Sequence, residues 1–547
     1  MKKLGKVFVL ILLMMAVILV GCNKDSGNTT DNDDDTVENN DNDKDNDDAE
    51  EDATADEGDG TGGEIKVAIN AQPPSLDPHM TTAGATSDIS KMMFETLLTT
   101  DSGYNPVPML AENVDVNDDN TEFIFTLRQG VNFHNGEEMT AEDVVASMNR
   151  WLELSGVAAG AFGDVEFEEV DTYTVKLVLN EPSSIALGVM ASSEQFPAIM
   201  PKEIIESAPA EGVEEFIGTG PYEFAEWKQD QYIHVTKYDE YASLDTPADG
   251  LSGQKNAYVE DIYYYVVTDP STRLAGIQSK EYDIAYSLPT DNYEQLTNMD
   301  DLFLLTQHTA TMDLIYNKRG ELMGNPKMRQ AVNALLNIEE VLQASLVNAE
   351  LYSMEASYMN SEIEQWATNA GEEFFNLNDP DKAQELLEEA GYDGETMIIM
   401  TTRDYEHYYN ASVVIQEQLE KIGVNTDLQV YDWPTITERR EEPDTWDLFV
   451  NAFPFKTDPT QLLQLNPSFA GGIADEKADG LLDDIATATS EEEASSIWEE
   501  LQEYAWAEYV PMTRLASFGS VTAVLNHLED LESSVSGTIL WNAKIND

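Results

Sequence analysis

The side chains best suited to catalysis or metal binding are scattered along this chain. The six histidines include no pair at the spacing of metal ligands: His79, His134, His234, His308, His407 and His527. The sequence has no phosphate-binding loop, no glycine-rich nucleotide turn and no G-x-S-x-G nucleophile motif. With 105 acidic residues, carboxylate pairs arise by chance and predict no glycosidase site. We therefore expect no covalent chemistry, no metal and no cofactor.

One segment nevertheless combines residue types that suit the binding of a ligand. Arg403 is a cation in a chain with few of them, and its guanidinium can bind a carboxylate through two parallel hydrogen bonds. Of the aromatic residues that follow it within about fifty positions, the candidates for ligand contact are Tyr405, Trp433, Phe453 and Phe455. Two alternatives stay open: Arg403 pairs with Asp404 or Glu406 at the surface, and the aromatic side chains belong to a core.

Composition excludes several classes of protein. The chain has 547 residues, of which 29 are Lys or Arg and 105 are Asp or Glu, for a formal net charge of −76. A nucleic-acid binder needs clustered cations, so that class is excluded. The 42% of hydrophobic residues is enough for a large core. A single cysteine, Cys22, excludes both a disulfide framework and a multi-cysteine metal site.

The N-terminus predicts export and a lipid anchor. Three lysines precede an apolar stretch from Val7 to Val20, which is the length of a signal-peptide core and too short to span a membrane. The stretch leads into Leu19-Val20-Gly21-Cys22, which resembles the bacterial lipobox, in which the cysteine is acylated after cleavage. We expect residues 1–21 to be the signal peptide and Cys22 the lipidated residue. An ordinary signal peptide with an incidental thiol is the alternative.

The charge pattern separates a tether from a folded region. Residues 23–63 contain 17 acidic residues, two lysines and almost nothing apolar, so we expect residues 22–63 to be an extended acidic spacer. Residues 64–547 still hold 88 acidic and 24 basic residues. Such self-repulsion is tolerated when salt screens it, which favours a halophilic source; an unusually acidic cell-surface protein is the alternative.

Hydrophobic periodicity in residues 64–547 predicts alternating strands and helices. Alternating patterns indicate strands near 65–69, 123–127, 173–177 and 262–267. Helices are expected after Thr140, with Asp143 completing a capping box, after Asp379-Pro380 as far as Gly391, and over 411–422. The fold class is therefore α/β.

A series of short motifs resembles one family, the extracellular solute-binding proteins of family 5, which serve bacterial oligopeptide, dipeptide and nickel ABC importers. The motifs occur in the family's order at residues 73–79 (PPSLDPH), 94–98 (FETLL), 110–113 (LAEN), 125–136 (FTLRQGVNFHNG), 140–144 (TAEDV), 218–222 (GTGPY), 328–332 (MRQAV) and 390–392 (AGY). Most of these motifs predict turns and packed positions that support the fold rather than residues of a binding site. We expect 218–222 to be a turn that uses glycine at positive φ, 133–136 to be a turn after a strand, and Arg329 to be packed or ion-paired.

The resemblance implies a two-lobed fold of the periplasmic-binding-protein type II class with an extra subdomain. Lobe I is expected at 64–307 and 515–547, with an inserted subdomain near 98–208, and lobe II at 308–514. Two crossing strands are expected to form the hinge, and the lobes to close over the ligand.

The resemblance also implies a binding site. In peptide-binding relatives, an aromatic residue and an Asp just before an Asp-Pro pair hold the peptide's ammonium group. Here Asp458-Pro459 matches the pair, but residues 454–457 contain no acid. Phe453 or Phe455 is the expected aromatic contact, and Asp458 or Asp432 the candidate replacement for the acid. The ligand residues expected are Arg403, Tyr405, Trp433, Phe453, Phe455 and Asp458.

The function implied is capture of an oligopeptide-like solute and its delivery to an ABC permease driven by separate ATPase subunits. The chain is then a monomer on the extracytoplasmic face of the cell membrane, held by its lipid and bound to no nucleic acid. An oligosaccharide, glycoside or metal chelate as the solute is the first alternative. A lipid-anchored hydrolase and a ligand sensor without transport are alternatives from other classes.

Overall fold

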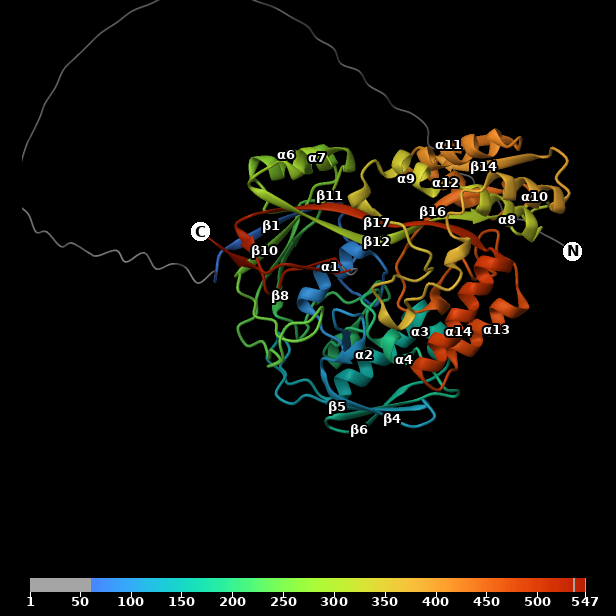
Figure 1. The fold of residues 1–547 in the computed structure, drawn as a ribbon. Coiled ribbons are helices and arrows are strands. Elements are labelled where there is room, and N and C mark those ends of the chain that lie inside the picture. Colours follow the sequence, from blue (N-terminus) through green and yellow to red (C-terminus); the bar gives the residue numbers. More distant parts are fainter. Residues whose placement is uncertain (1–60, 535–536, 547) are drawn as a thin grey trace, which may run out of the picture. The chain divides into compact units, whose positions relative to one another are not determined.

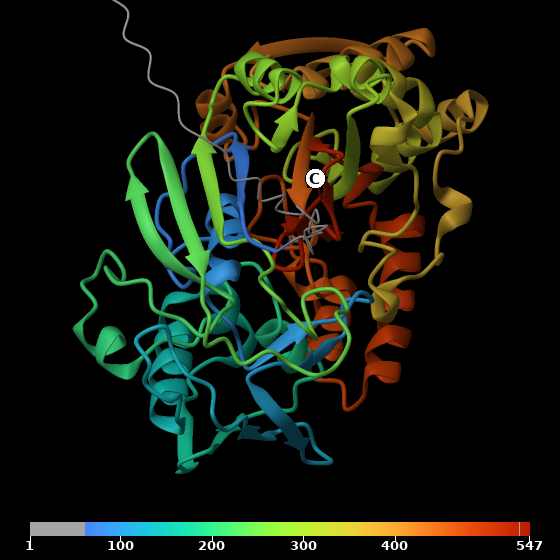
Figure 2. The same ribbon diagram turned by 90° about the vertical axis from the view of Figure 1, so that its left-hand side faces the viewer.

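An eleven-stranded mixed sheet forms the centre of the molecule. The computed structural model describes residues 61–534 and 537–546, so the predicted signal peptide, Cys22 and nearly all of the tether lie outside the described residues. The strands follow one another in the order β15 (Asn425–Tyr431), β14 (Thr396–Thr402), β16 (Leu448–Pro454), β12 (Leu302–Tyr316), β17 (Met512–Leu525), β11 (Ile284–Leu288), β1 (Glu64–Ile69), β10 (Asp261–Val266), β9 (Tyr232–Lys237) and β8 (Tyr222–Lys228), with β13 (Tyr352–Ser353) paired to β17. Figure 2 shows the edge strand β8 and its neighbour β9 beside β10 and β1.

Two long antiparallel strands, β12 and β17, connect the two halves of this sheet. On one side, β16 pairs with β12 and runs parallel to β14 and β15. On the other side, β11 pairs with β17 and runs parallel to β1 and β10. The β12–β17 register shifts between His308 and Ala310 and again between Met312 and Asp313. Each half thus contains three parallel strands, and β9 and β8 extend the second half in antiparallel pairing. The β12–β17 pair connects one half to the other.

Helices cover the two halves of the sheet separately (Figure 1). One group is α6 (Pro270–Ser279) and α7 (Tyr293–Thr297); the other includes α8 (Pro326–Leu335), α9 (Ile338–Leu346), α10 (Pro380–Ala390) and α11 (Glu406–Lys421). The predicted caps of α10 are confirmed, because Asp379 accepts a hydrogen bond from the Lys382 amide and Gly391 ends the helix at φ 79°. The predicted stripe of α11 is also confirmed: Ala411, Ile415 and Leu419 are buried. No helix within the described ranges is apolar and long enough to cross a membrane.

A smaller antiparallel sheet lies inside the segment predicted as an inserted subdomain. Its order is β4 (Ala111–Val116), β5 (Glu122–Leu127), β7 (Thr174–Val178) and β6 (Phe167–Asp171). Alternate residues Phe123, Phe125 and Leu127 are buried in a core that includes α2 (Ala141–Leu154). The predicted capping box of α2 is present, with the Thr140 amide donating to Asp143 Oδ2 at 2.9 Å. Three shorter helices follow α2: α3 (Gly156–Phe162), α4 (Ala186–Met190) and α5 (Lys202–Ser207).

The second half of the chain adds three further helices: α12 (Trp433–Arg439), α13 (Glu476–Ala486) and α14 (Glu491–Tyr504).

The prediction that the 218–222 turn needs glycine at a positive φ is wrong. Neither Gly218 nor Gly220 has a positive φ. Both instead allow close contact with the end of α1 (Gly84–Met93): a Cβ at Gly218 would lie 2.2 Å from the Met93 carbonyl oxygen, and one at Gly220 would lie 2.6 Å from that of Met92. Absence of a side chain, rather than backbone freedom, is the reason for glycine here.

Two histidines of the sequence motifs hold loops together in the neutral state. His134 Nδ1 accepts from the Gly218 amide at 3.2 Å, and Nε2 lies 3.1 Å from the Gly220 carbonyl oxygen. The imidazole thus contacts both glycines of the 218–222 turn and holds it in place. His79 Nδ1 lies 3.0 Å from Arg150 Nη1, and Nε2 lies 3.0 Å from the Ala198 carbonyl. Burial lowers the pKa of each imidazole to about 4. The motifs around His79 and His134 are therefore scaffold, as predicted for residues 133–136, where Gly136 completes the turn at φ 83°.

Arg329 is packed rather than ion-paired. Its side chain is 1% exposed and donates to the backbone carbonyls of Met323 at 2.6 Å and Val510 at 2.9 Å, and to that of Tyr509. The guanidinium thus ties the start of α8 to the segment that leads into β17, which explains the 328–332 motif in structural terms.

Candidate functional site

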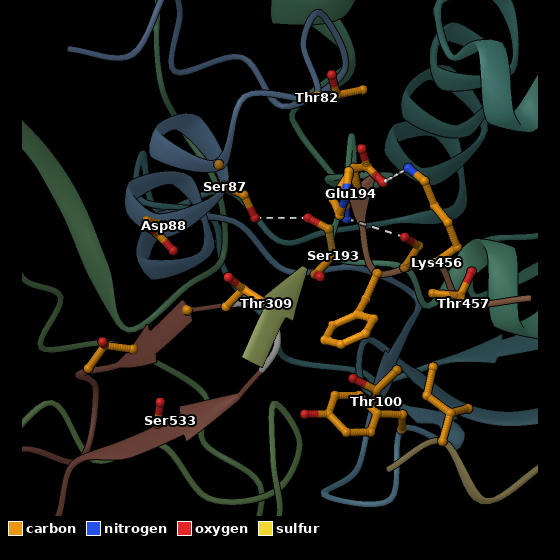
Figure 3. Close-up of a pocket in the computed structure, with 18 of the residues that line it drawn as sticks. Thr82, Ser87, Asp88, Thr100, Ser193, Glu194, Thr309, Lys456, Thr457 and Ser533 are labelled. Atoms are coloured by element: carbon orange, nitrogen blue, oxygen red, sulfur yellow. Dashed lines mark hydrogen bonds and ion pairs between the residues drawn. The ribbon is translucent and has the colours of Figure 1, made fainter. Parts of the chain in front are cut away.

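A cavity of about 380 Å³ is enclosed by segments from both halves of the large sheet. One wall comes from the start of α1, residues 100–106, residues 188–194 and the end of β11. The opposite wall comes from Thr309 of β12, the segment 454–461 after β16 and residues 363–365; Ser520 and Thr522 of β17 also line it (Figure 3). Its volume lies within the range of small-molecule sites.

The lining is rich in side chains with hydroxyl or amide groups and has few charged ones. Most lining residues carry a hydroxyl or amide: Asn70, Thr82, Ser87, Thr100, Asn105, Ser192, Ser193, Ser287, Thr309, Gln365, Thr457, Gln461, Ser520, Thr522, Ser533 and Thr538. Aromatic contact is limited to Tyr104, Tyr286 and Phe455, and the acidic and basic residues are Asp88, Glu194 and Lys456. Such a wall suits a polar ligand that makes many hydrogen bonds and carries little net charge.

An ion pair spans the cavity between its two walls. Lys456 Nζ lies 2.7 Å from Glu194 Oε2, and the two side chains are 14% and 26% exposed (Figure 3). Lys456 follows β16, whereas Glu194 follows α4, so the pair joins parts of the chain that are 262 positions apart. A carboxylate from a distant segment thus lies beside residues 454–457, which themselves contain no acid.

Asp88 is the second carboxylate of the cavity. It lies on α1, and 23% of its side chain is exposed. Burial raises the pKa of Asp88, and Lys91, whose Nζ lies 3.4 Å from Oδ1, opposes that rise. Among residues 61–534 and 537–546, no group of three or more His, Cys, Asp or Glu side chains is placed to hold a metal ion.

Two non-glycine residues of the cavity wall have a positive φ. Tyr104 and Ser287 line the cavity at φ 62° and 51°, a conformation that non-glycine residues rarely adopt. The buried Arg273 stabilises this backbone at Ser287, because its Nη2 donates to the Ser287 carbonyl at 2.7 Å and its Nε to the Tyr286 carbonyl at 2.9 Å. Strain that the surrounding structure maintains is characteristic of ligand sites.

Three of the predicted site residues lie in or beside the segment 453–458. Phe455 lines the cavity. Asp458 is 3% exposed and accepts from the Thr460 amide at 2.9 Å and from Gln461 Nε2 at 2.5 Å. Burial raises the pKa of Asp458. Asp458 does not itself line the cavity, but its hydrogen bond positions Gln461, which does. Phe453 is buried against Phe469, with ring centroids 5.5 Å apart.

The other three predicted residues, Arg403, Tyr405 and Trp433, lie together outside this cavity. Arg403 stacks on Tyr409 at 3.7 Å from the ring centroid, and Tyr405, which is 40% exposed, packs edge-on against Trp433 at 5.1 Å. They follow β14 and β15, whose carboxyl ends share a sheet edge with that of the parallel strand β16. The cavity reaches that edge only at β16. Asp432, the other proposed replacement for the missing acid, caps α12 by accepting from the Thr435 amide.

Sequence reasoning missed the wall formed by the first half of the chain. This wall includes Ser87 and Asp88 of α1 and the loop residues Ser192, Ser193 and Glu194. Short polar residues form no recognisable pattern in the sequence, and acidic residues occur throughout the chain. The one available signal was the absence of an acid in 454–457, for which Asp458 and Asp432 were the only replacements considered.

Comparisons with known proteins agree with this architecture. The sequence model for bacterial extracellular solute-binding proteins, family 5 Middle, matches residues 105–470, more than half of the chain. The probable peptide ABC transporter periplasmic-binding protein y4tO of Sinorhizobium fredii is 29% identical over 468 residues, covering 80% of this chain and 85% of that protein.

Solved structures show the same fold. The ABC transporter substrate-binding protein CtaP of Listeria monocytogenes superposes with a TM-score of 0.78 at 19% identity, covering 89% of this chain and all of that one. The oligopeptide-binding protein AppA of Bacillus subtilis, solved with a nonapeptide, superposes with a TM-score of 0.67 at 23% identity, covering 87% of this chain and 99% of that one. The two-lobed fold predicted from the sequence is confirmed, and the chain belongs to the bacterial extracellular solute-binding proteins of family 5.

Proposed function

We propose that this protein is the solute-binding component of an ABC importer and that it captures a short oligopeptide-like solute in the 380 Å³ cavity. The observation that carries the proposal is the cavity itself, which both halves of the sheet enclose and which hydroxyl and amide groups line. A peptide presents alternating N–H and C=O groups that such a wall can satisfy. The proteins it resembles include a peptide transporter component and a structure with a bound nonapeptide.

The proposed ligand is short because the cavity is near the lower end of the range for ligand sites. Glu194, rather than Asp458, is placed to receive a ligand ammonium group, and Lys456 to receive a carboxylate. Phe455 supplies an apolar contact. Arg403, Tyr405 and Trp433 contact the solute only where it extends past the cavity along the carboxyl edge of β14 and β15, and this assignment stays a prediction.

Capture involves closure of two lobes, which we place at 64–307 with 515–547 and at 308–514. The strands β12 and β17 connect them, and the register shift at His308–Ala310 lies at the proposed boundary. A ligand that contacts both walls binds the closed state more tightly than the open one and so shifts the population toward closure.

In this proposal the protein works outside the cytoplasm as a monomer, anchored by the lipid on Cys22 through the acidic tether, and hands its solute to the permease and ATPase subunits. The chemistry is binding alone, without catalysis. A non-peptide polar solute such as an oligosaccharide, a glycoside or a metal chelate is the second candidate, favoured by the basic Lys456 in the segment where peptide-binding relatives carry an acid.

The test is thermal unfolding in molar salt, with and without a mixed digest of short peptides and with the same digest N-acetylated. Ligand at a hundredfold excess over Kd stabilises the native state by about 2.7 kcal/mol, which shifts the melting temperature. We expect a shift with the free-amine digest and a smaller one after acetylation. No shift with either digest, in protein shown to be free of carried-over ligand, contradicts the peptide proposal.

A further inference from the structure

The strand β11 contains one extra residue where it passes the ligand cavity. Its pairing with β17 advances by three residues along β11, from 285 to 288, and by only two along β17, from 523 to 521. Tyr286 and Ser287 therefore lie opposite the single residue Thr522, which is the arrangement of a β-bulge. All three of these residues line the 380 Å³ cavity.

The extra residue changes which side chains of β11 face the cavity. Side chains of a regular strand alternate between its two faces. Ile284 and Tyr286 pack into one hydrophobic core, whereas Ala285 and Leu288 pack into another, so the alternation shifts by one position at Ser287. The consecutive residues Tyr286 and Ser287 consequently both line the cavity. β-Bulges beside functional sites often redirect a side chain in this way.

The guanidinium of Arg273 holds the backbone of the bulge. Arg273 is buried, and it donates to the carbonyls of Ser287 at 2.7 Å, Tyr286 at 2.9 Å, Val267 at 2.7 Å and Thr268 at 3.0 Å. Four of its five N–H groups are thus used on backbone carbonyls. Arg273 therefore acts on the conformation of the wall and does not itself line the cavity.

The hydroxyl of Ser287, by contrast, is available to a ligand. Within residues 61–534 and 537–546 this hydroxyl has no hydrogen-bond partner, and the residue is half-buried. Two other hydroxyls of the wall are used within the protein: Ser87 donates to the Ser193 carbonyl at 2.8 Å, and Thr457 accepts from Gln461 at 2.8 Å. The Ser287 hydroxyl is therefore placed to form a hydrogen bond with a bound solute.

The backbone at this position favours glycine over serine. Ser287 has φ 51°, in the left-handed region, where an L-residue is less stable than glycine because of its Cβ. The backbone conformation therefore does not explain a side chain at position 287, whereas a contact between its hydroxyl and the solute does. Residues held in such conformations cluster at ligand sites.

We propose that the Ser287 hydroxyl binds a backbone N–H or C=O group of the solute and that Arg273 is the positioning residue that keeps the bulge in place. A hydroxyl can both donate and accept, so it can pair with either group of a peptide. The inference rests on the proposed function and adds to it a specificity-determining contact, made by the half of the sheet that contains β11.

The first test separates the hydroxyl from the backbone. Isothermal titration calorimetry with the mixed digest of short peptides gives an apparent affinity for the wild type, Ser287→Ala and Ser287→Gly. Ser287→Ala keeps the Cβ at positive φ and removes only the hydroxyl, so we expect binding about two- to tenfold weaker, the range of one neutral hydrogen bond. Ser287→Gly should weaken binding equally but melt at a higher temperature than Ser287→Ala, because glycine tolerates this φ.

Val347→Gly is the matched control for relief of a positive φ. Val347 has φ 64°, is 63% exposed after α9 and does not line the cavity. We expect Val347→Gly to leave the affinity for the digest unchanged. Unchanged affinity in both Ser287 variants overturns the proposed contact and leaves the proposed function standing. A wild type that binds no peptide of the digest overturns the proposed function and this inference with it.

The second test examines the positioning role of Arg273. If Arg273 acts through Ser287, then Arg273→Met weakens binding in the wild type and adds no further loss in Ser287→Ala. Arg273→Lys keeps the charge and up to three donors, so it should recover part of the affinity and keeps the test decisive where Arg273→Met does not fold. An equal loss of affinity from either Arg273 variant in the wild type and in Ser287→Ala overturns the positioning role.

Discussion

Lys456 and Glu194 meet across the ligand cavity, with Nζ 2.7 Å from Oε2, although they belong to segments on opposite walls. The pair is partly exposed, so salt weakens it and its contribution to overall stability is about 1 kcal/mol or less. Its position matters more than its strength, because any opening of the cavity separates the two charges. In the proposed closure of the two lobes, the ion pair therefore favours the closed state in the absence of ligand.

Reversing one charge of this pair should open the ligand-free molecule. Lys456→Glu places two carboxylates face to face, and we expect a larger radius of gyration in small-angle X-ray scattering at low salt. The double variant Lys456→Glu with Glu194→Lys restores the attraction and should return the radius to the wild-type value. A double variant as expanded as the single one contradicts this role for the pair.

The buried ion pair of Arg514 and Asp313 should contribute far more to stability than the pair of Lys456 and Glu194. Both side chains are 0% exposed, and Arg514 Nε lies 2.7 Å from Asp313 Oδ1 where β12 and β17 pair. Removing one partner of such a pair leaves an uncompensated buried charge, so Arg514→Met should lower the free energy of unfolding by about 3–5 kcal/mol. Urea denaturation measures this decrease in the free energy of unfolding. Lys477→Met, which removes an exposed ion pair to Glu500, is the control and should cost at most about 1 kcal/mol.

His79 should make the fold sensitive to acid. Its pKa is about 4 in the native protein against 6.5 for an ordinary imidazole, so between these values the unfolded chain binds a proton that the native state does not. Stability from this group is complete above pH 6.5 and is lost as the pH falls, by roughly 3 kcal/mol at pH 4.

Nitrogen NMR of His79 checks the cause directly. Because arginine can only donate, Nδ1 must accept from Arg150 and Nε2 must carry the proton that the Ala198 carbonyl accepts. We expect an Nε2–H tautomer that does not titrate between pH 5 and 8. A midpoint near 6.5 contradicts the assignment.

Gly218 should not tolerate even a methyl group. An added Cβ would lie 2.2 Å from the Met93 carbonyl oxygen, which is backbone and moves only with α1. We expect Gly218→Ala to destabilise the protein by about 1–3 kcal/mol. Gly160→Ala is the control: it lies within α3 with nothing within 4 Å of the new Cβ, and helix propensity predicts a gain of about 0.5–1 kcal/mol. Equal effects of the two changes on the melting temperature would refute the contact argument.

The sequence predicted the scaffold better than the site, and the reason is physical. Helix caps such as Thr140 with Asp143 and Asp379 with Pro380 are local, so the spacing of a few residues is enough to identify them. Phe455, which lines the cavity, was expected from the family resemblance because it shortly precedes an Asp-Pro pair. Glu194 and Ser193 are brought to the cavity only by the tertiary fold, and the close approach of Gly218 to Met93 likewise depends on packing between distant segments.

The most direct test of the central claim is equilibrium binding of the peptide pool that stabilises the wild type, measured on one variant inside the cavity and one outside it. Thr309→Trp fills the cavity from β12, and Arg403→Ala removes the guanidinium at the sheet edge. We expect Thr309→Trp to weaken binding at least a hundredfold and Arg403→Ala to change it by less than about tenfold. Full affinity in Thr309→Trp, with loss of binding in Arg403→Ala, would contradict capture within the cavity and place the ligand at the edge of β14.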